Sequence, residues 1–349
     1  MQLAFELSGE YETLPKAETL ACLDMSGTSY KEVVFKKGVL LIVEVQLNEK
    51  SLEALLKFLR ERLAMTHRVL RVFALCEPSE EAVLNALCDA EDEIREFLGN
   101  EEVCRGFAVR VRKRGLLPVK IDSMTLERRL GAEVKRWGFS VRLKNPDRTI
   151  CVLITKDVCV LGGVLQNMDK KQFLQRAPQA RPFFMPGVLL PKFARALVNL
   201  SRVRSGGRFL DPFCGTGGIL IEAALVGAEV FGCDILKRAV QGAAENLKFY
   251  GLKGEFAACD ATALCLRDES IDAIATDPPY GRSTHMRRPL ERLYEDAISE
   301  MHRVLKKNHF VIVLSNFKDV PHDGFELLET HECYVHKSLT RYVNVLRKV

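Results

Sequence analysis

The stretch from residue 209 to residue 219, FLDPFCGTGGI, decides the fold of the C-terminal half of the chain. Apolar residues lead into Asp211 and glycines follow it, which predicts a strand that turns directly into a helix. Such glycines let the backbone adopt positive φ and approach a ligand closely. The stretch has neither the G-x-G-x-x-G of a nicotinamide-binding turn nor the Gly-Lys-Ser/Thr end of a P-loop. Asp211 could instead accept the ammonium group of a zwitterionic amino-acid cofactor; the alternative is a tight turn without a ligand.

Strand and helix patterns alternate regularly around and after this stretch. We expect strands at 208–210, 230–233, 255–258, 273–276 and 310–314, helices at 218–225, 238–250 and 290–305, and a closing antiparallel hairpin of 325–336 with 341–346. This order is typical of a doubly wound, Rossmann-like parallel sheet, so the fold class is α/β.

Two further carboxylates end the next two expected strands. Asp234 follows Asp211 by 23 residues, which is close to the spacing at which an acidic side chain binds the hydroxyls of a ribose. Asp260 ends the third strand and could accept a hydrogen bond from an adenine amino group. A helix cap is the alternative role for Asp234, and a turn is the alternative role for Asp260.

The most specific motif is Asp277-Pro278-Pro279-Tyr280, which follows an apolar strand. Methylation of an exocyclic amine needs two acceptors for its N–H groups, so that the nitrogen lone pair can turn toward the methyl donor. The Asp277 carboxylate and the Pro278 carbonyl can supply them, because two consecutive proline rings fix φ. Tyr280 offers a flat face to a base that has left its stack. The alternative is a proline-rich turn after a buried strand.

The N-terminal half mixes helix and strand patterns and becomes strongly basic. Apolar residues at 107, 109 and 111 alternate with Arg110 and Arg112, which predicts a half-buried strand with an arginine face. From 104 to 148 there are thirteen Lys or Arg against four Asp or Glu. This asymmetry indicates an anionic partner, and a solvated charged face is the alternative.

Composition narrows the class of protein. No uninterrupted apolar run reaches about 18 residues, and the first twelve residues carry acids where a secretory signal carries bases. We therefore expect no membrane segment and a cytoplasmic protein. The eleven cysteines include no CxxC pair, so we expect no metal site and reduced cysteines packed as small apolar residues.

A length of 349 residues suggests two or three domains. Three prolines between residues 178 and 186 mark a linker. We expect an N-terminal α/β part at 1–50, a basic-faced domain at 51–165, the linker at 166–187 and the parallel sheet at 188–349.

With these motifs assembled, residues 205–316 resemble class I methyltransferases that act on amino groups, whose motif is [D/N/S]-P-P-[Y/F/W]. The run from Arg176 to Arg195 is similar to the segment that precedes the catalytic domain in THUMP-domain tRNA guanosine-N2 methyltransferases acting at tRNA position 10. The resemblance implies a ferredoxin-like part at 1–50, a THUMP RNA-binding domain at 51–165, and S-adenosylmethionine-dependent methylation of a tRNA guanosine. It also implies, for some members, a small zinc-binding activator subunit.

The resemblance also implies roles for individual residues. Those expected to bind the cofactor are Asp211, Cys214, Gly215, Thr216, Gly217, Asp234, Asp260 and Phe183, although Phe183 could equally anchor the linker. The catalytic residues would be Asp277, Pro278, Pro279 and Tyr280. RNA would be bound by Arg110, Arg112, Lys113 and Arg114, and Arg282, His285, Arg287 and Arg288 could lie near the flipped base or its phosphate.

Four alternatives stay open. The same chemistry could act at another tRNA guanosine or on ribosomal RNA, or an adenine-N6 or cytosine-N4 DNA methyltransferase could share the motif. A protein glutamine methyltransferase also places an amide against a Pro-Pro-Tyr turn. A non-catalytic RNA-binding protein is the fourth, but such a protein has no need of an intact Asp-Pro-Pro-Tyr motif.

Overall fold

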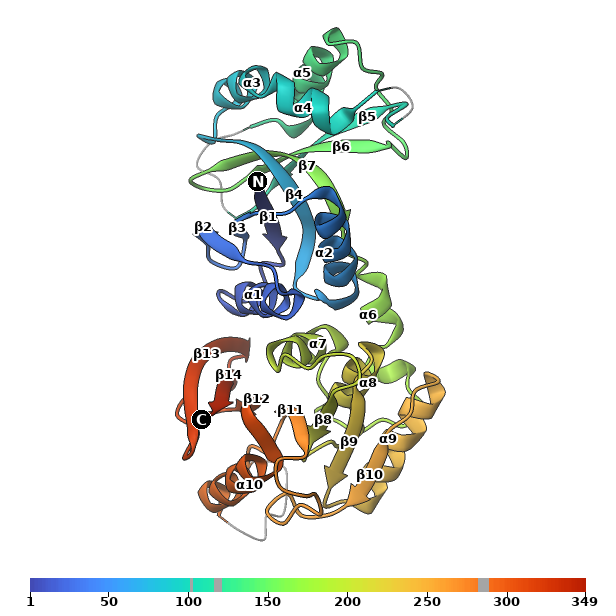
Figure 1. The fold of residues 1–349 in the computed structure, drawn as a ribbon, viewed down its shortest axis with the longest axis vertical. Coiled ribbons are helices and arrows are strands. Elements are labelled where there is room, and N and C mark those ends of the chain that lie inside the picture. The colour runs from blue at the N-terminus through green and yellow to red at the C-terminus, as the bar shows by residue number, and fades with distance from the viewer. Residues whose placement is uncertain (101–102, 116–120, 282–288) are drawn as a thin grey trace. The chain divides into compact units, whose positions relative to one another are not determined.

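The computed structural model describes residues 1–100, 103–115, 121–281 and 289–349. The chain divides into two compact units (Figure 1). The N-terminal unit comprises residues 1–10, 28–60 and 66–168, and the C-terminal unit comprises residues 11–27, 61–65 and 169–349.

The N-terminal unit is built on a seven-stranded sheet in the order β2-β3-β1-β4-β7-β6-β5. Its strands are β1 (Gln2–Leu7), β2 (Tyr30–Lys36), β3 (Leu40–Val45), β4 (Thr66–Cys76), β5 (Phe107–Lys113), β6 (Arg148–Ile154) and β7 (Cys159–Asn167). Neighbouring strands are antiparallel except β5 and β6, which are parallel. The expected 1–50 part and the basic-faced domain thus contribute strands to one continuous sheet.

Helices α2 (Glu49–Arg62), α3 (Glu80–Asp89), α4 (Glu91–Leu98) and α5 (Ser123–Arg136) accompany this sheet. Ser79 caps the N-terminus of α3, because its side chain accepts a hydrogen bond from the backbone N–H of Ala82 at 3.1 Å. The alternation predicted for β5 is confirmed: its apolar side chains at 107, 109 and 111 enter a core shared with α3, α4 and α5, while Arg112 is exposed.

The C-terminal unit contains the expected doubly wound sheet, in the order β10-β9-β8-β11-β12-β14-β13. Its strands are β8 (Arg208–Asp211), β9 (Glu229–Asp234), β10 (Glu255–Ala258), β11 (Ile271–Thr276), β12 (Leu305–Ser315), β13 (Phe325–His336) and β14 (Leu339–Lys348). The strands from β8 to β12 are parallel. The predicted closing hairpin is confirmed, with β14 antiparallel to both β12 and β13.

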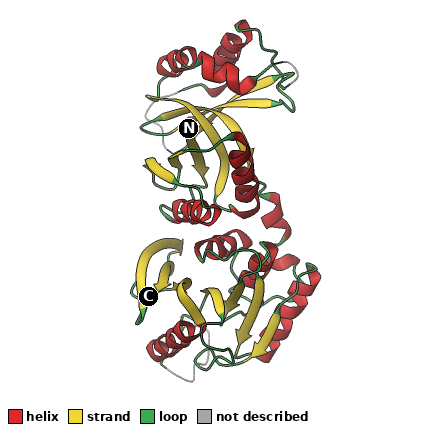
Figure 2. Ribbon diagram, viewed as in Figure 1, coloured by secondary structure: helices red, strands yellow, loops and turns green. Residues whose placement is uncertain are grey.

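Helices cover both faces of this sheet (Figure 2). On one face, α1 (Leu14–Ser26), α7 (Pro191–Leu200), α8 (Gly218–Leu225) and α9 (Lys237–Phe249) share a core with Phe209 of β8. On the other face, α10 (Leu290–Val304) packs with Leu210 of the same strand. Successive residues of β8 therefore enter different cores, as the two-residue period of a strand requires.

The segment expected to be a linker has its own structure, with helix α6 (Lys171–Gln175) and a short 3₁₀ turn at Pro178–Ala180. Helices α4 and α7 and strands β1 and β2 were not predicted. Neither strand shows the alternation of buried and exposed side chains that predicts a strand, because β1 is buried along almost its whole length and β2 is half-exposed. Within the described ranges, no helix combines the length and apolar character that a membrane span requires.

Candidate active site

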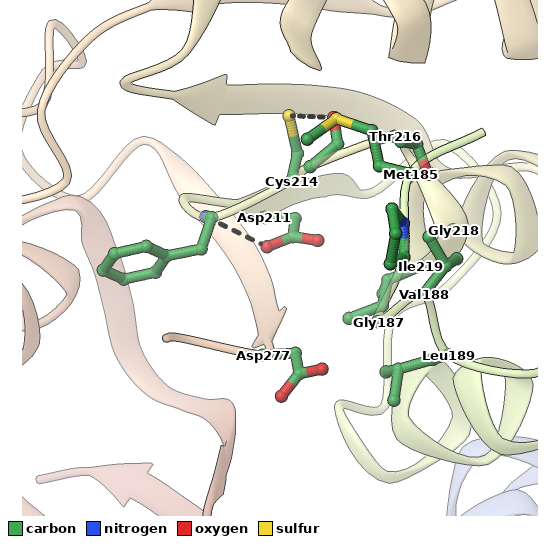
Figure 3. A pocket seen from close by; sticks show the side chains of 13 residues that line it. Met185, Gly187, Val188, Leu189, Asp211, Cys214, Thr216, Gly218, Ile219 and Asp277 are labelled. Carbon is green, nitrogen blue, oxygen red and sulfur yellow. Dashed lines mark hydrogen bonds between the residues drawn. The ribbon is translucent and has the colours of Figure 1, made fainter. Parts of the chain in front are cut away.

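A pocket opens at the carboxyl edge of the C-terminal sheet. Strands β9 and β10 follow β8 in one direction while β11 and β12 extend in the other, and ligands of such sheets bind where the strand order reverses. The pocket has an empty volume of about 560 Å³, which includes the solvent at its mouth. Figure 3 shows Asp211 and Asp277 on one side and residues 187–189 on the other.

Asp211 ends β8 and is buried, with 1% of its surface exposed. Its Oδ1 accepts hydrogen bonds from the Thr276 hydroxyl at 2.7 Å and from the Phe213 backbone N–H at 3.1 Å. Burial raises the pKa of Asp211 to about 7 despite these two bonds. Within the described ranges Asp211 forms no ion pair, so a cationic group of a ligand would meet an uncompensated carboxylate here.

The loop after Asp211 approaches the pocket closely. Gly215 and Gly217 adopt positive φ of 48° and 79°, and a Cβ on Gly217 would lie only 3.1 Å from Ala243 of α9. The Thr216 hydroxyl is buried and has no hydrogen-bond partner among the described residues. Thr216, Cys214 and Gly215 all line the pocket. An unpartnered buried hydroxyl beside an uncompensated carboxylate fits a zwitterionic ligand with donors and acceptors of its own.

Asp234 lies at the end of β9 and holds the loop in place. Its Oδ2 accepts from the backbone N–H of Gly215 at 2.9 Å, and its Oδ1 accepts from that of Leu236 at 2.9 Å. Asp260 follows β10, and its Oδ1 accepts from the backbone N–H and the hydroxyl of Thr262. Both carboxylates are half-buried. That of Asp234 keeps lone pairs for a ligand, because a carboxylate offers about four acceptor positions.

The Asp-Pro-Pro-Tyr turn follows β11 at the same edge. Asp277 is half-buried and lines the pocket, while Pro278 is buried. The Tyr280 hydroxyl donates a hydrogen bond to Asp277 Oδ1. Burial raises the pKa of Asp277, an effect that the Tyr280 hydrogen bond and the charge of Arg341 oppose. Strands β8 and β11 are direct neighbours, so the turn places its carboxylate beside Asp211.

The opposite wall comes from residues that were not expected to line the pocket. Residues 185–189 line the pocket, and the arginine-rich run on both sides of them is tied to α8 by buried ion pairs. Glu222 pairs with Arg176 and with Arg195, each at 2.8 Å, and its side chain has no exposed surface. The run from Arg176 to Arg195 therefore builds one wall, and the only signal in the sequence was the resemblance it carried.

Phe183 lies outside the pocket lining and packs against α9. Its backbone N–H and carbonyl both bond to the Asn246 side chain, at 3.0 and 2.9 Å, and its ring occupies the space that a Cβ on Gly242 would need. Gly217, Asp234, Asp260, Pro278, Pro279 and Tyr280 also lie outside the lining of this pocket. Five expected residues line it: Asp211, Cys214, Gly215, Thr216 and Asp277.

Three of the four expected RNA-binding side chains are engaged within the N-terminal unit. Arg110 donates to the carbonyls of Val109 and Leu143, Lys113 donates to the Ile121 carbonyl, and Arg114 pairs with the buried Glu6. Arg112 is exposed at the edge of the sheet.

Arg282, His285, Arg287 and Arg288 lie outside the described residues. In the described part of the chain, no group of three or more His, Cys, Asp or Glu side chains could hold a metal ion. All eleven cysteines are unpaired, and most of them are buried.

Comparisons with known proteins agree with this geometry. Residues 178–342 match the RMKL-like methyltransferase domain, and residues 91–164 match the THUMP domain. The chain is 36% identical to a tRNA (guanine(10)-N2)-dimethyltransferase of Methanothermobacter thermautotrophicus over 100% of both chains. It is 33% identical to the enzyme of that name from Methanocaldococcus jannaschii, over 99% of this chain and 100% of the relative.

The fold also has a solved counterpart. The crystal structure of TrmN from Thermus thermophilus is 23% identical, with a TM-score of 0.58 over 100% of both chains. The full-length relatives confirm the resemblance at the level of the family, and the solved structure confirms it at the level of the fold. Because its likeness to these relatives runs the full length of the chain, the protein belongs to the family of THUMP-domain tRNA guanine-N2 methyltransferases.

Proposed function

We propose that this protein transfers a methyl group from S-adenosylmethionine to the exocyclic N2 amino group of guanosine 10 in tRNA. The observation that carries the proposal is the placement of Asp211 and Asp277 in one pocket at the reversal point of the sheet. A cofactor whose ammonium group is bound by Asp211 would lie beside an amine bound by Asp277.

The residues present suit S-adenosylmethionine, which supplies a methyl group on a positively charged sulfur. Asp211 would accept from the ammonium group, and the Thr216 hydroxyl would find the partner that it lacks. The free lone pairs of Asp234 would accept from the ribose hydroxyls, and Asp260 would accept from the adenine amino group. Phe183 would contribute by anchoring the linker wall, since its ring packs against α9.

The Asp-Pro-Pro-Tyr turn would prepare the amine for transfer. The Asp277 carboxylate and the Pro278 carbonyl accept its two N–H groups and turn the lone pair toward the methyl carbon. S-adenosylmethionine would supply the methyl group, with the N–C bond forming as the S–C bond breaks, and Asp277 would accept the proton that the amine releases. In the structure Tyr280 donates to Asp277, so the guanine N–H would replace the tyrosine hydroxyl there. The freed ring would stack on the base, a contact of about 1–3 kcal/mol.

The N-terminal unit would bind the tRNA through its shape and phosphates, as proteins bind structured RNA. Arg112 and Lys113 are both exposed. Arg112 would contact phosphate directly, whereas Lys113, like Arg110 and Arg114, would first have to leave its present partner. We also propose that a small zinc-binding activator subunit binds this protein and that the protein is located in the cytoplasm.

We expect the affinity for S-adenosylmethionine to rise with pH up to about 7. Burial raises the pKa of Asp211 to about 7, and only the ionised carboxylate attracts the ammonium group. Below that pKa the affinity should fall about tenfold per pH unit, with protons released on binding. Calorimetric titrations between about pH 5.5 and about pH 7.5 would measure both effects. A constant affinity over this range would contradict the role assigned to Asp211.

The substrate is tested with labelled S-adenosylmethionine and two tRNA transcripts, one with guanosine and one with adenosine at position 10, with and without the zinc-binding partner. We expect label only in the first transcript, recovered as N2-methylated guanosine. Equal label in both transcripts would support methyl transfer to tRNA but would show that another guanosine is the target. No label in either transcript, even with the partner, would contradict tRNA methylation and favour another macromolecular substrate.

A further inference from the structure

Strand β14 brings a charged residue to the edge of the sheet where the pocket opens. Thr276 of β11 aligns with Val313 of β12, and Val313 aligns with Asn344 of β14. Since β14 runs antiparallel to β12, its first residues extend beyond the end of β11. Arg341, three residues before Asn344, therefore reaches the level of the Asp-Pro-Pro-Tyr turn.

The guanidinium of Arg341 faces this turn. Its Cζ lies 5.9 Å from the centroid of the Tyr280 ring, within the range of a cation–π contact. Its Nε is buried and has no hydrogen-bond partner among the described residues. The contact with the Tyr280 ring places the positive charge of Arg341 against the turn.

The charged and titratable groups around Asp277 come from four elements. Tyr280 belongs to the same turn, Asp211 ends β8, Tyr294 lies on α10, and Arg341 lies on β14. Among these described groups Arg341 is the only cation, and its charge lowers the pKa that burial raises in Asp277. The hydroxyl of Tyr294 donates to the Leu314 carbonyl at 3.5 Å.

We infer that Arg341 is a positioning residue for methyl transfer, which steadies the Tyr280 ring and supplies the positive charge that the Asp277 carboxylate faces. This inference rests on the proposed function. When the base enters and Tyr280 releases Asp277, the carboxylate loses a donor, and Arg341 then keeps it ionised and able to accept from the N2 amine. Arg341 acts through Asp277 and Tyr280 and need not touch the base.

The test compares single-turnover rate constants of the full-length protein across pH, with saturating S-adenosylmethionine and a guanosine-10 tRNA. Methyl transfer needs ionised Asp277, so the rate falls as pH drops through the pKa of that group. Arg341→Met and Arg341→Gln remove the charge and raise this pKa, which should move the acid limb to higher pH by about one unit. At low pH the rate would be about tenfold below wild type, and near pH 8 the loss would be smaller.

Two variants serve as controls. Arg341→Lys keeps the charge and should keep the acid limb of the wild type. Arg347→Met removes an arginine from the same strand that pairs with Glu326, and its pH profile should match the wild type. Thermal melting and cofactor affinity, measured for each variant, separate loss of fold from loss of positioning.

The outcomes are distinct. A folded Arg341→Met or Arg341→Gln protein with a wild-type acid limb would overturn the inference. If neither neutral variant folds, Arg341→Lys decides the matter: an acid limb that moves despite the retained charge would also overturn it. Wild-type protein that transfers no methyl group to tRNA would refute the proposed function instead.

Discussion

Replacement of Asp277 by alanine is expected to lower the rate of methyl transfer about a hundredfold to a thousandfold, the usual effect of removing one preorganised group at a reacting centre. In the proposed function this carboxylate is the acceptor that turns the amine toward the methyl donor, and the substitution removes it. Affinity for S-adenosylmethionine should stay close to wild type, because the proposed function assigns cofactor binding to Asp211 and the glycine loop. Single-turnover rates and calorimetric affinities would measure the two effects separately.

The matched control is Asp277→Asn, which retains one acceptor oxygen but cannot take up the released proton. We expect it to lie between wild type and alanine. An asparagine variant with full turnover would remove the proton-accepting role of Asp277. An alanine variant with full turnover would remove the catalytic assignment of the turn.

Replacement of Asp211 by asparagine is expected to have two opposite effects. Affinity for S-adenosylmethionine should fall about tenfold to a hundredfold, because a hydrogen bond to a charged group contributes about 1.5–3 kcal/mol. The free energy of unfolding of the cofactor-free protein should rise, since a buried carboxylate is replaced by a neutral side chain that can still accept from Thr276.

The pH dependence of this stability gain follows from linkage. The pKa of Asp211 is raised from 3.8 to about 7, so the folded state binds more protons than the unfolded state between these values, and ionisation destabilises the fold as pH rises. The gain from Asp211→Asn should therefore be largest above about pH 7, at most about 4 kcal/mol, and should vanish near pH 4. Chemical denaturation at several pH values would measure it. A variant less stable than wild type at high pH would contradict this account of the buried carboxylate.

The C-terminal sheet was predictable because its signals are local. Each strand is a short apolar run, and Asp211 and Asp277 stand at the ends of two of them. Parallel strands present their carboxyl ends at one edge, so the shared pocket follows from the pattern. The hairpin of β13 and β14 was also predicted from the sequence. The position of Arg341 beside the Asp-Pro-Pro-Tyr turn was not, because it depends on the register between β12 and β14.

The remaining wall of the pocket required long-range contacts. The sequence of residues 185–189 is typical of a proline-rich linker. Long-range contacts place them opposite Asp211, among them the ion pairs of Glu222 with Arg176 and Arg195 and the hydrogen bonds of Phe183 with Asn246. The packing of α1 in the C-terminal unit was equally hidden. It depends on buried Glu18, which accepts from the backbone N–H groups of Ala64 and Met65 and from the Asn199 amide. No periodic pattern in the sequence records such contacts.

The most direct test of the central claim replaces guanosine 10 of the tRNA with inosine, which differs from guanosine only in lacking the exocyclic N2 amino group. The two tRNAs would be incubated with the protein and labelled S-adenosylmethionine, and their nucleosides separated after digestion. The account predicts label in the guanosine-10 tRNA as N2-methylated guanosine and none in the inosine-10 tRNA. Equal methylation of both tRNAs would show that the amine is not the acceptor at this position and would contradict the account.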